Sequence, residues 1–167
     1  MHKGLLKGFC LKLTVDISDA KMSSDPSDQL VTYSLGSCIG VTVYDPNTKV
    51  GGLLHFQLPS SRTDRIKSNE KPFMFADTGM TTMMKQLTSM GAKKGDLKVK
   101  LAGGAAIMAS QNGNIGKRNY AAIRQLLWKN GMFIDKEDIG GTSPRNVTLD
   151  INTGKVTIKS LGVETNL

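Results

Sequence analysis

Cysteine and histidine are the residues of this 167-residue chain whose types and spacing could do nucleophilic chemistry. Cys38 and His55 flank one short stretch, "DPNT", within residues 34–59. A thiol becomes a ready nucleophile when a neighbouring base takes its proton, and a histidine can later donate that proton to a nitrogen leaving group. If the two side chains meet, the pair is suited to acyl transfer from an amide.

The stretch "DPNT" (45–48) predicts how the two side chains meet. Four residues of this turn chemistry form a common hairpin loop, so Tyr44 should pair with Lys49 in the flanking strands. In that register Cys38 lies directly opposite His55, where cross-strand Cβ atoms are about 4.5–5.5 Å apart. The other face of the hairpin is apolar and belongs in the core: Ile39, Val41, Val43, Val50 and Leu54.

Two neighbouring features would complete a catalytic site. Residues 35–37, "LGS", supply backbone N–H groups on a tight turn that could hold the oxyanion of a tetrahedral intermediate. Thr32, at the end of the preceding predicted strand, could orient the imidazole of His55 through its hydroxyl. Spacing alone picks out no acidic residue for that role.

Structural roles compete with this hypothesis. A single cysteine in a strand is usually a small buried hydrophobe, and a single strand histidine more often has a structural role. The predicted contact between Cys38 and His55 favours function, because two independent structural roles would otherwise have to coincide. Cys10 has no base nearby and His2 lies at a chain end, so neither is a candidate.

Length and composition predict a single globular domain over residues 1–167. No apolar run approaches the ~18 residues of a membrane span, and Lys7 and Lys12 interrupt the opening segment, which makes a poor signal peptide. We therefore expect a cytoplasmic protein with both cysteines free and no membrane insertion. The sequence has no CxxC or HxxxH spacing and no phosphate-loop pattern, so neither a metal nor a cofactor is expected.

The formal net charge of +8 allows two kinds of partner. Clustered Lys and Arg would favour nucleic acid, but the charges here are scattered and are not interleaved with aromatic residues. An acidic protein partner explains the excess equally well, by speeding encounter. A nucleic-acid-binding module stays the weaker alternative, and it predicts a steep, salt-dependent affinity for a duplex.

The elements that must position the site are mostly strands. Hydrophobic periodicity predicts an amphipathic helix through Met80–Met90 and a second helix over Gly116–Asn130, each followed by glycine. The methionine stripe of the first helix is assigned to the core. We expect an α+β fold, with two main helices packed on a largely antiparallel sheet or sandwich. The predicted strands are Cys10–Ile17, Gln29–Ser34, Cys38–Tyr44, Val50–Phe56, Leu97–Leu101, Met132–Asp135, Val147–Ile151 and Val156–Lys159.

Two connections have sequence signatures of their own. "SSRTDRIKSNEK" (60–71) lacks apolar periodicity and should be an exposed loop beside the site, able to act as a lid. "NTGK" (152–155) should join two antiparallel strands as a hairpin near the end of the chain.

Around these residues the sequence resembles the CheD family of chemoreceptor glutamine deamidases. "LVTYSLGSCIGVTVYD" (30–45) and "KVGGLLHFQLPSS" (49–61) are similar to the family's threonine, LGSC and H-x-x-LP motifs. "FADTGM", "LAGGAAIM", "NIGKRN" and "DIGGTSPRNVTLDINTGKV" continue the resemblance in order, so it covers roughly residues 29–159. Residues 1–28 match less clearly, and Pro144 stands where the family pattern suggests glycine before Arg145.

The resemblance implies a cysteine amidohydrolase that converts glutamine side chains of methyl-accepting chemotaxis receptors to glutamate through a thioester, releasing ammonia. By position, Cys38 would be the nucleophile, His55 the general base and acid, and Thr32 the orienting residue. The resemblance also implies a fold similar to that of deamidating bacterial toxins, and CheC, a chemotaxis phosphatase, as a further partner. The alternative function is a non-catalytic module that binds CheC or the receptor, which a Cys38→Ala variant would distinguish.

Overall fold

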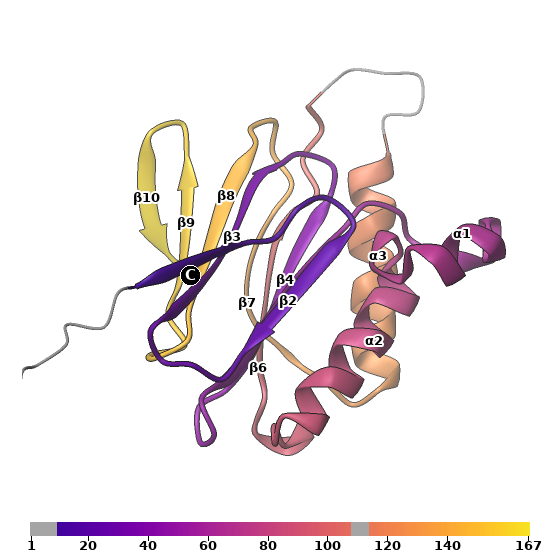
Figure 1. The fold of residues 1–167 in the computed structure, drawn as a ribbon. Coiled ribbons are helices and arrows are strands. Elements are labelled where there is room, and N and C mark those ends of the chain that lie inside the picture. Colours follow the sequence, from indigo (N-terminus) through magenta and orange to yellow (C-terminus); the bar gives the residue numbers. More distant parts are fainter. Residues whose placement is uncertain (1–9, 108–113) are drawn as a thin grey trace, which may run out of the picture.

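The computed structural model describes residues 10–107 and 114–167, which form two five-stranded sheets and a helical layer (Figure 1). The first sheet contains, in spatial order, β1 (Leu11–Thr14), β3 (Asp28–Leu35), β8 (Arg145–Asp150), β9 (Val156–Ser160) and β10 (Val163–Asn166). The second contains β2 (Asp19–Ser23), β5 (Val50–Phe56), β4 (Ile39–Asp45), β6 (Lys98–Gly103) and β7 (Ile134–Ile139). The pairs β1–β3 and β6–β7 are parallel and the remaining pairs are antiparallel, which confirms the predicted α+β fold.

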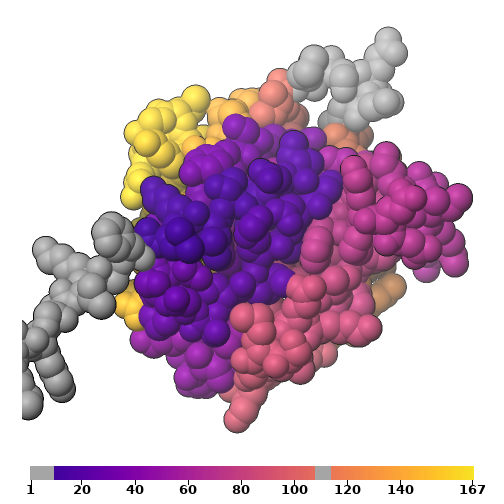
Figure 2. Space-filling view, viewed as in Figure 1, coloured from indigo at the N-terminus to yellow at the C-terminus, as the bar shows by residue number. Residues whose placement is uncertain are grey.

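The layers are stacked as helices, second sheet and first sheet. Helices α2 (Ala76–Ser89) and α3 (Ile115–Lys129) cover the outer face of the second sheet, and the first sheet packs on its other face (Figure 1). Strands β4 and β5 are therefore buried along their whole length, because both of their faces are covered. The short helix α1 (Arg65–Glu70) projects at the edge away from the β9–β10 hairpin (Figure 2).

Apolar periodicity determines which face of each long helix packs against the second sheet. Met80, Met83 and Leu87 of α2 point into the core against the second sheet, as do Ile123 and Leu127 of α3. The predicted methionine stripe is thus confirmed as core at Met80 and Met83, but the prediction is wrong at its end, because Met90 is exposed. No helix in residues 10–107 and 114–167 combines the length and the apolar character that a membrane span requires.

The segment 60–71, predicted to be an irregular loop, is instead largely helical. A 3-10 turn at Ser61–Thr63 leads into α1, and the Asp64 side chain caps α1 by accepting the Lys67 N–H at 2.9 Å. The prediction was wrong because polar caps form this short helix without any apolar stripe. The segment is exposed as expected, except that Ser68 is buried.

Strand boundaries differ from the predictions where strands lie at sheet edges. β1 covers only part of the predicted strand Cys10–Ile17, and β2 and β10 were not predicted. β2 reads "DAKMS", whose polar–apolar alternation is short and includes no β-branched or aromatic residue, and β10 reads "VETN", which does not alternate. The predicted hairpin at 152–155 is confirmed, because it joins the antiparallel strands β8 and β9.

Candidate active site

The hairpin of β4 and β5 has a register two residues away from the predicted one. Asp45 pairs with Val50, and Gly40 lies opposite His55. The loop includes Lys49, which takes a left-handed conformation (φ 55°) and donates its N–H to the Asp45 carbonyl at 2.8 Å. The prediction that His55 would face the cysteine directly across the ladder was therefore wrong. Because strand side chains alternate, a shift of two residues leaves every side chain on its predicted face.

Cys38 lies just before β4, in the short bend that carries the chain from the first sheet to the second. We call residues 36–38 the Cys38 bend. If the alternation of β4 continues one residue into the bend, Cys38 shares the face of Gly40 and His55 and lies diagonal to the histidine, where Cα atoms are typically about 7–8 Å apart. The cysteine is partly buried against the core between the sheets. Among the described residues no hydrogen bond joins its sulfur to the imidazole.

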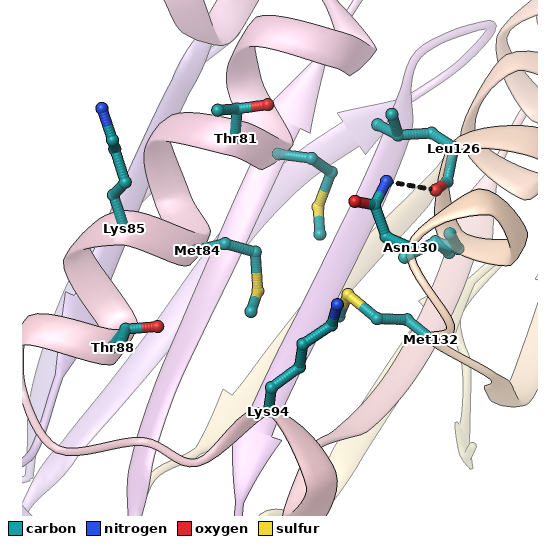
Figure 3. Close-up of a pocket in the computed structure, with 10 residues that line it drawn as sticks. Thr81, Met84, Lys85, Thr88, Lys94, Leu126, Asn130 and Met132 are labelled. Carbon is teal, nitrogen blue, oxygen red and sulfur yellow. Dashed lines mark hydrogen bonds between the residues drawn. The ribbon is translucent and has the colours of Figure 1, made fainter.

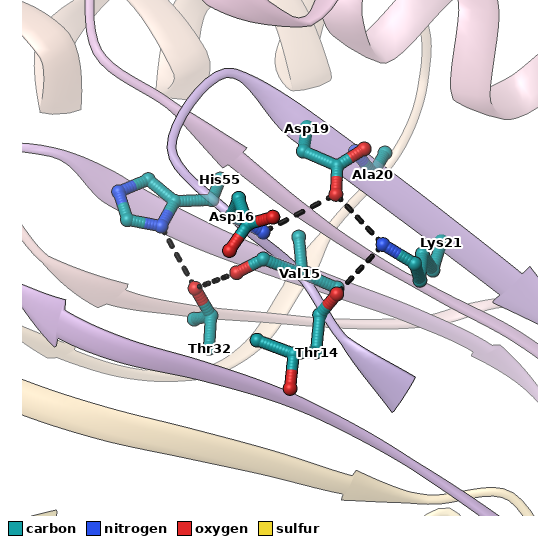
Figure 4. A network of polar contacts seen from close by, with 8 residues as sticks. All are labelled: Thr14, Val15, Asp16, Asp19, Ala20, Lys21, Thr32 and His55. Carbon is teal, nitrogen blue, oxygen red and sulfur yellow. Dashed lines mark hydrogen bonds and ion pairs between the residues drawn. The ribbon is translucent and has the colours of Figure 1, made fainter. Parts of the chain in front are cut away.

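A chain of two hydrogen bonds fixes the protonation of His55 (Figure 4). Nδ1 of His55 lies 2.8 Å from Oγ1 of Thr32, and that hydroxyl donates to the Val15 carbonyl at 2.7 Å. A carbonyl can only accept, so the hydroxyl proton points to Val15 and Nδ1 must supply the proton between ring and hydroxyl. Nε2 is therefore the unprotonated nitrogen, and it is buried with no partner among the described residues.

The surroundings favour the neutral forms of the His55 imidazole and the Cys38 thiol. Burial lowers the pKa of His55 from 6.5 to about 4, and the nearby carboxylates of Asp16 and Asp19 oppose this only in part. Asp19 is itself held by an ion pair with Lys21 at 2.9 Å (Figure 4). Burial also raises the pKa of the Cys38 thiol. At neutral pH the site thus holds a thiol and a free imidazole base, not a preformed ion pair.

The Cys38 bend is held by the segment that follows β6. The Ala105 N–H donates to the Gly36 carbonyl at 2.8 Å, and the Gly104 N–H donates to the Cys38 carbonyl at 2.9 Å. Gly103 adopts φ +112°, and a Cβ there would lie 2.3 Å from the Cys38 carbonyl oxygen. Only glycine therefore lets this segment approach the bend so closely.

Arg145 holds that supporting segment in turn. Its buried guanidinium donates to the carbonyls of Gly103 at 3.2 Å and Gly140 at 2.6 Å, and Nε contacts the Asp138 carboxylate at 3.2 Å. The arginine comes from β8 of the first sheet, whereas Gly103 ends β6 of the second. Arg145 therefore links the two sheets beside the Cys38 bend, a contact that the sequence analysis did not predict.

Comparison with known proteins places the chain in a family. The family model described as CheD chemotactic sensory transduction matches residues 57–160. A protein of Syntrophus aciditrophicus (strain SB), named as a probable chemoreceptor glutamine deamidase CheD, is 49% identical over 149 residues, 89% of this chain and 93% of that protein. A protein of the same name from Solibacter usitatus (strain Ellin6076) is 41% identical over 157 residues, 93% of each chain. This chain belongs to the CheD family.

The CheD comparisons also cover the candidate site. The family-model match starts at residue 57, beyond all three predicted site residues. An alignment of 149 residues in a chain of 167, however, necessarily includes Thr32, Cys38 and His55. The structure brings Thr32 and His55 into contact, and Cys38 lies in the bend before β4, packed against the core between the sheets.

An apolar pocket of about 440 Å³ lies between α2 and α3, outside the candidate site (Figure 3). Its walls include Met84, Leu126 and Met132, with Lys85 and Lys94 also among the lining residues. None of the predicted site residues lines it. The three predicted site residues therefore lie at the junction of the two sheets, apart from this pocket.

Proposed function

We propose that this chain is a cysteine amidohydrolase that deamidates glutamine side chains of methyl-accepting chemotaxis receptors to glutamate. The observation that carries the proposal is the relay from the Val15 carbonyl through Thr32 to His55, which leaves Nε2 as a bare base on the face that Cys38 shares. The substrate follows from the names of the relatives, which are chemoreceptor glutamine deamidases. The reducing cytoplasm suits a protein whose cysteines, Cys10 and Cys38, are both free.

The reaction runs in two acyl-transfer steps. Nε2 of His55 takes the thiol proton as the Cys38 sulfur attacks the side-chain carbonyl carbon of the glutamine. The imidazolium then gives that proton to the departing nitrogen, which leaves as ammonia, and a thioester remains. A water molecule gives a proton to His55 and attacks the thioester carbon. The carbon–sulfur bond then breaks, the imidazolium returns the proton to the sulfur, and the glutamate product and the free thiol are released.

The diagonal placement sets one requirement on the first step. The Cys38 side chain must turn toward His55 for the proton to pass, because no hydrogen bond joins the two groups among the described residues. Catalytic hydrogen bonds often form fully only once the substrate is bound. Thr32 keeps the ring in one tautomer and one orientation while the sulfur moves.

The test is mass spectrometry of a receptor cytoplasmic fragment after incubation with the protein. Wild-type protein should add about one dalton per converted glutamine and release ammonia, and Cys38→Ala should lose at least about 10³-fold in rate. Cys10→Ala is the matched control, because Cys10 is the exposed second cysteine and lies outside the site. Full receptor regulation by Cys38→Ala, with no ammonia released by the wild type, would instead favour a non-catalytic module that binds the receptor or CheC.

A further inference from the structure

We propose that Asn119 is a positioning residue, which aims the backbone N–H of Cys38 at the oxyanion that forms during acyl transfer. The inference rests on the proposed deamidase function and adds a residue to its machinery. Asn119 lies on α3, far from the hairpin in sequence, and its side chain is fully buried (0% exposed).

The Asn119 amide bridges the two halves of the site. Its Nδ2 donates to the Ser37 carbonyl at 3.0 Å and to the Gln57 carbonyl at 3.0 Å. Both partners are acceptors, so the nitrogen must face them and each of its two hydrogens is used. Ser37 precedes the cysteine, and Gln57 lies two residues after His55. The Asn119 side chain thus ties the Cys38 bend to the residue that directly follows β5, the strand of His55.

The bond to Ser37 sets the direction of the next N–H group. The Ser37 carbonyl and the Cys38 N–H belong to one peptide unit, and no described peptide bond is cis. In a trans peptide the C=O and N–H bonds point in opposite directions. Holding the carbonyl toward Asn119 therefore turns the Cys38 N–H away from α3.

The Cys38 N–H is free to meet a substrate. No acceptor for it occurs among the described residues. An N–H of the nucleophile itself, beside the attacking atom, is where an oxyanion donor is required.

The side-chain oxygen of Asn119 lowers the stability of the folded chain in this arrangement. Its Oδ1 is buried and has no hydrogen-bond partner among residues 10–107 and 114–167. An unpaired buried acceptor is destabilising, so a side chain chosen for stability alone would avoid it. The role of Asn119 therefore lies in the two hydrogen bonds that its Nδ2 donates.

The experiment compares two reactions of the same thiol in a Cys10→Ala background, where Cys38 is the remaining cysteine. Deamidation needs an oxyanion donor, whereas alkylation by iodoacetamide develops no oxyanion. Asn119→Asp should lower kcat for deamidation about 10- to 100-fold and leave KM within about two-fold, because one misdirected donor typically costs this much or more. The alkylation rate of Cys38 should stay within about two-fold of the parent.

Three further variants make the result decisive. Asn119→Ala removes both donors without adding charge, and it gives the same readout if Asn119→Asp does not fold. Asn130→Asp is the matched control, since Asn130 caps the same helix and its side chain donates to the Leu126 carbonyl of that helix. His55→Gln should slow both reactions, because it removes the base.

Each outcome has a separate meaning. A folded Asn119 variant with normal kcat, or one in which alkylation falls as far as kcat, would overturn the positioning role. Absence of deamidation by the parent protein would refute the proposed function itself.

Discussion

In the proposed mechanism, Thr32 decides which nitrogen of His55 acts as the base. Its hydroxyl proton goes to the Val15 carbonyl, so the ring must donate from Nδ1. Thr32→Val keeps the shape but leaves Nδ1–H buried and unpaired, and we expect kcat to fall about 10²-fold. Thr32→Ser keeps the hydroxyl and should stay within a few-fold of wild type. Steady-state kinetics on a receptor fragment measures both, and equal activity of the two variants would contradict the tautomer argument.

His55 should also make stability depend on pH. Its pKa is about 4 in the folded chain and near 6.5 when unfolded, so the unfolded state binds more protons between these values. Its contribution is therefore fully present above about pH 6.5 and is lost as pH falls toward 4, by on the order of 3 kcal/mol.

Urea unfolding at pH 7 and at about pH 4.5 checks this prediction. The free energy of unfolding should fall more steeply in the wild type than in His55→Gln, which has no titrating ring. Parallel loss in the two proteins would show that other groups control acid stability.

At the residue scale, the sequence predicted the contact between Thr32 and His55, and it missed the register of the hairpin. Cys38 and His55 stood out because few residue types can act as nucleophile and base, and their catalytic roles stay a prediction. The register was missed because Lys49, a residue that seldom adopts positive φ, extends the turn. Asn119 had no local signal, since its bonds reach from a helix to two segments far away in sequence.

Among the elements, the end of β6 packs directly against the Cys38 bend. Gly103→Ala would place a Cβ 2.3 Å from the Cys38 carbonyl oxygen on a backbone with φ +112°. We expect a loss of about 1–3 kcal/mol in stability and a clear fall in kcat, because the Cys38 bend must move. Gly95→Ala is the matched control, since a Cβ there has no neighbour within 4 Å. Unfolding and kinetic measurements on both variants test the contact, and normal kcat for Gly103→Ala would refute it.

Elements with a strong apolar period were predictable, and those held by caps or edges were not. α2 and α3 follow a stripe that packs on the second sheet. α1 depends on the Asp64 cap, and β2 gains its order by pairing with β5. These features arise from local polar contacts or from distant strands, which periodicity does not detect.

For the whole molecule, the excess of positive charge should govern substrate capture. With a net charge of +8, binding to an acidic receptor fragment should weaken as salt screens the attraction. We expect KM to rise several-fold between about 50 and about 500 mM salt, with kcat nearly constant. The alkylation rate of Cys38 by uncharged iodoacetamide is the control and should stay flat. A KM that is independent of salt would remove the electrostatic argument.

Because the candidate site lies at the junction between the sheets, its activity should depend on how the two sheets pack together. Thr32 belongs to the first sheet and His55 to the second, and Cys38 lies on the crossing between them. Mild denaturation that separates the two sheets should abolish activity while the hydrogen bonds between strands within each sheet remain. Conversely, a binding protein that clamps both layers could speed the reaction without touching a reacting atom.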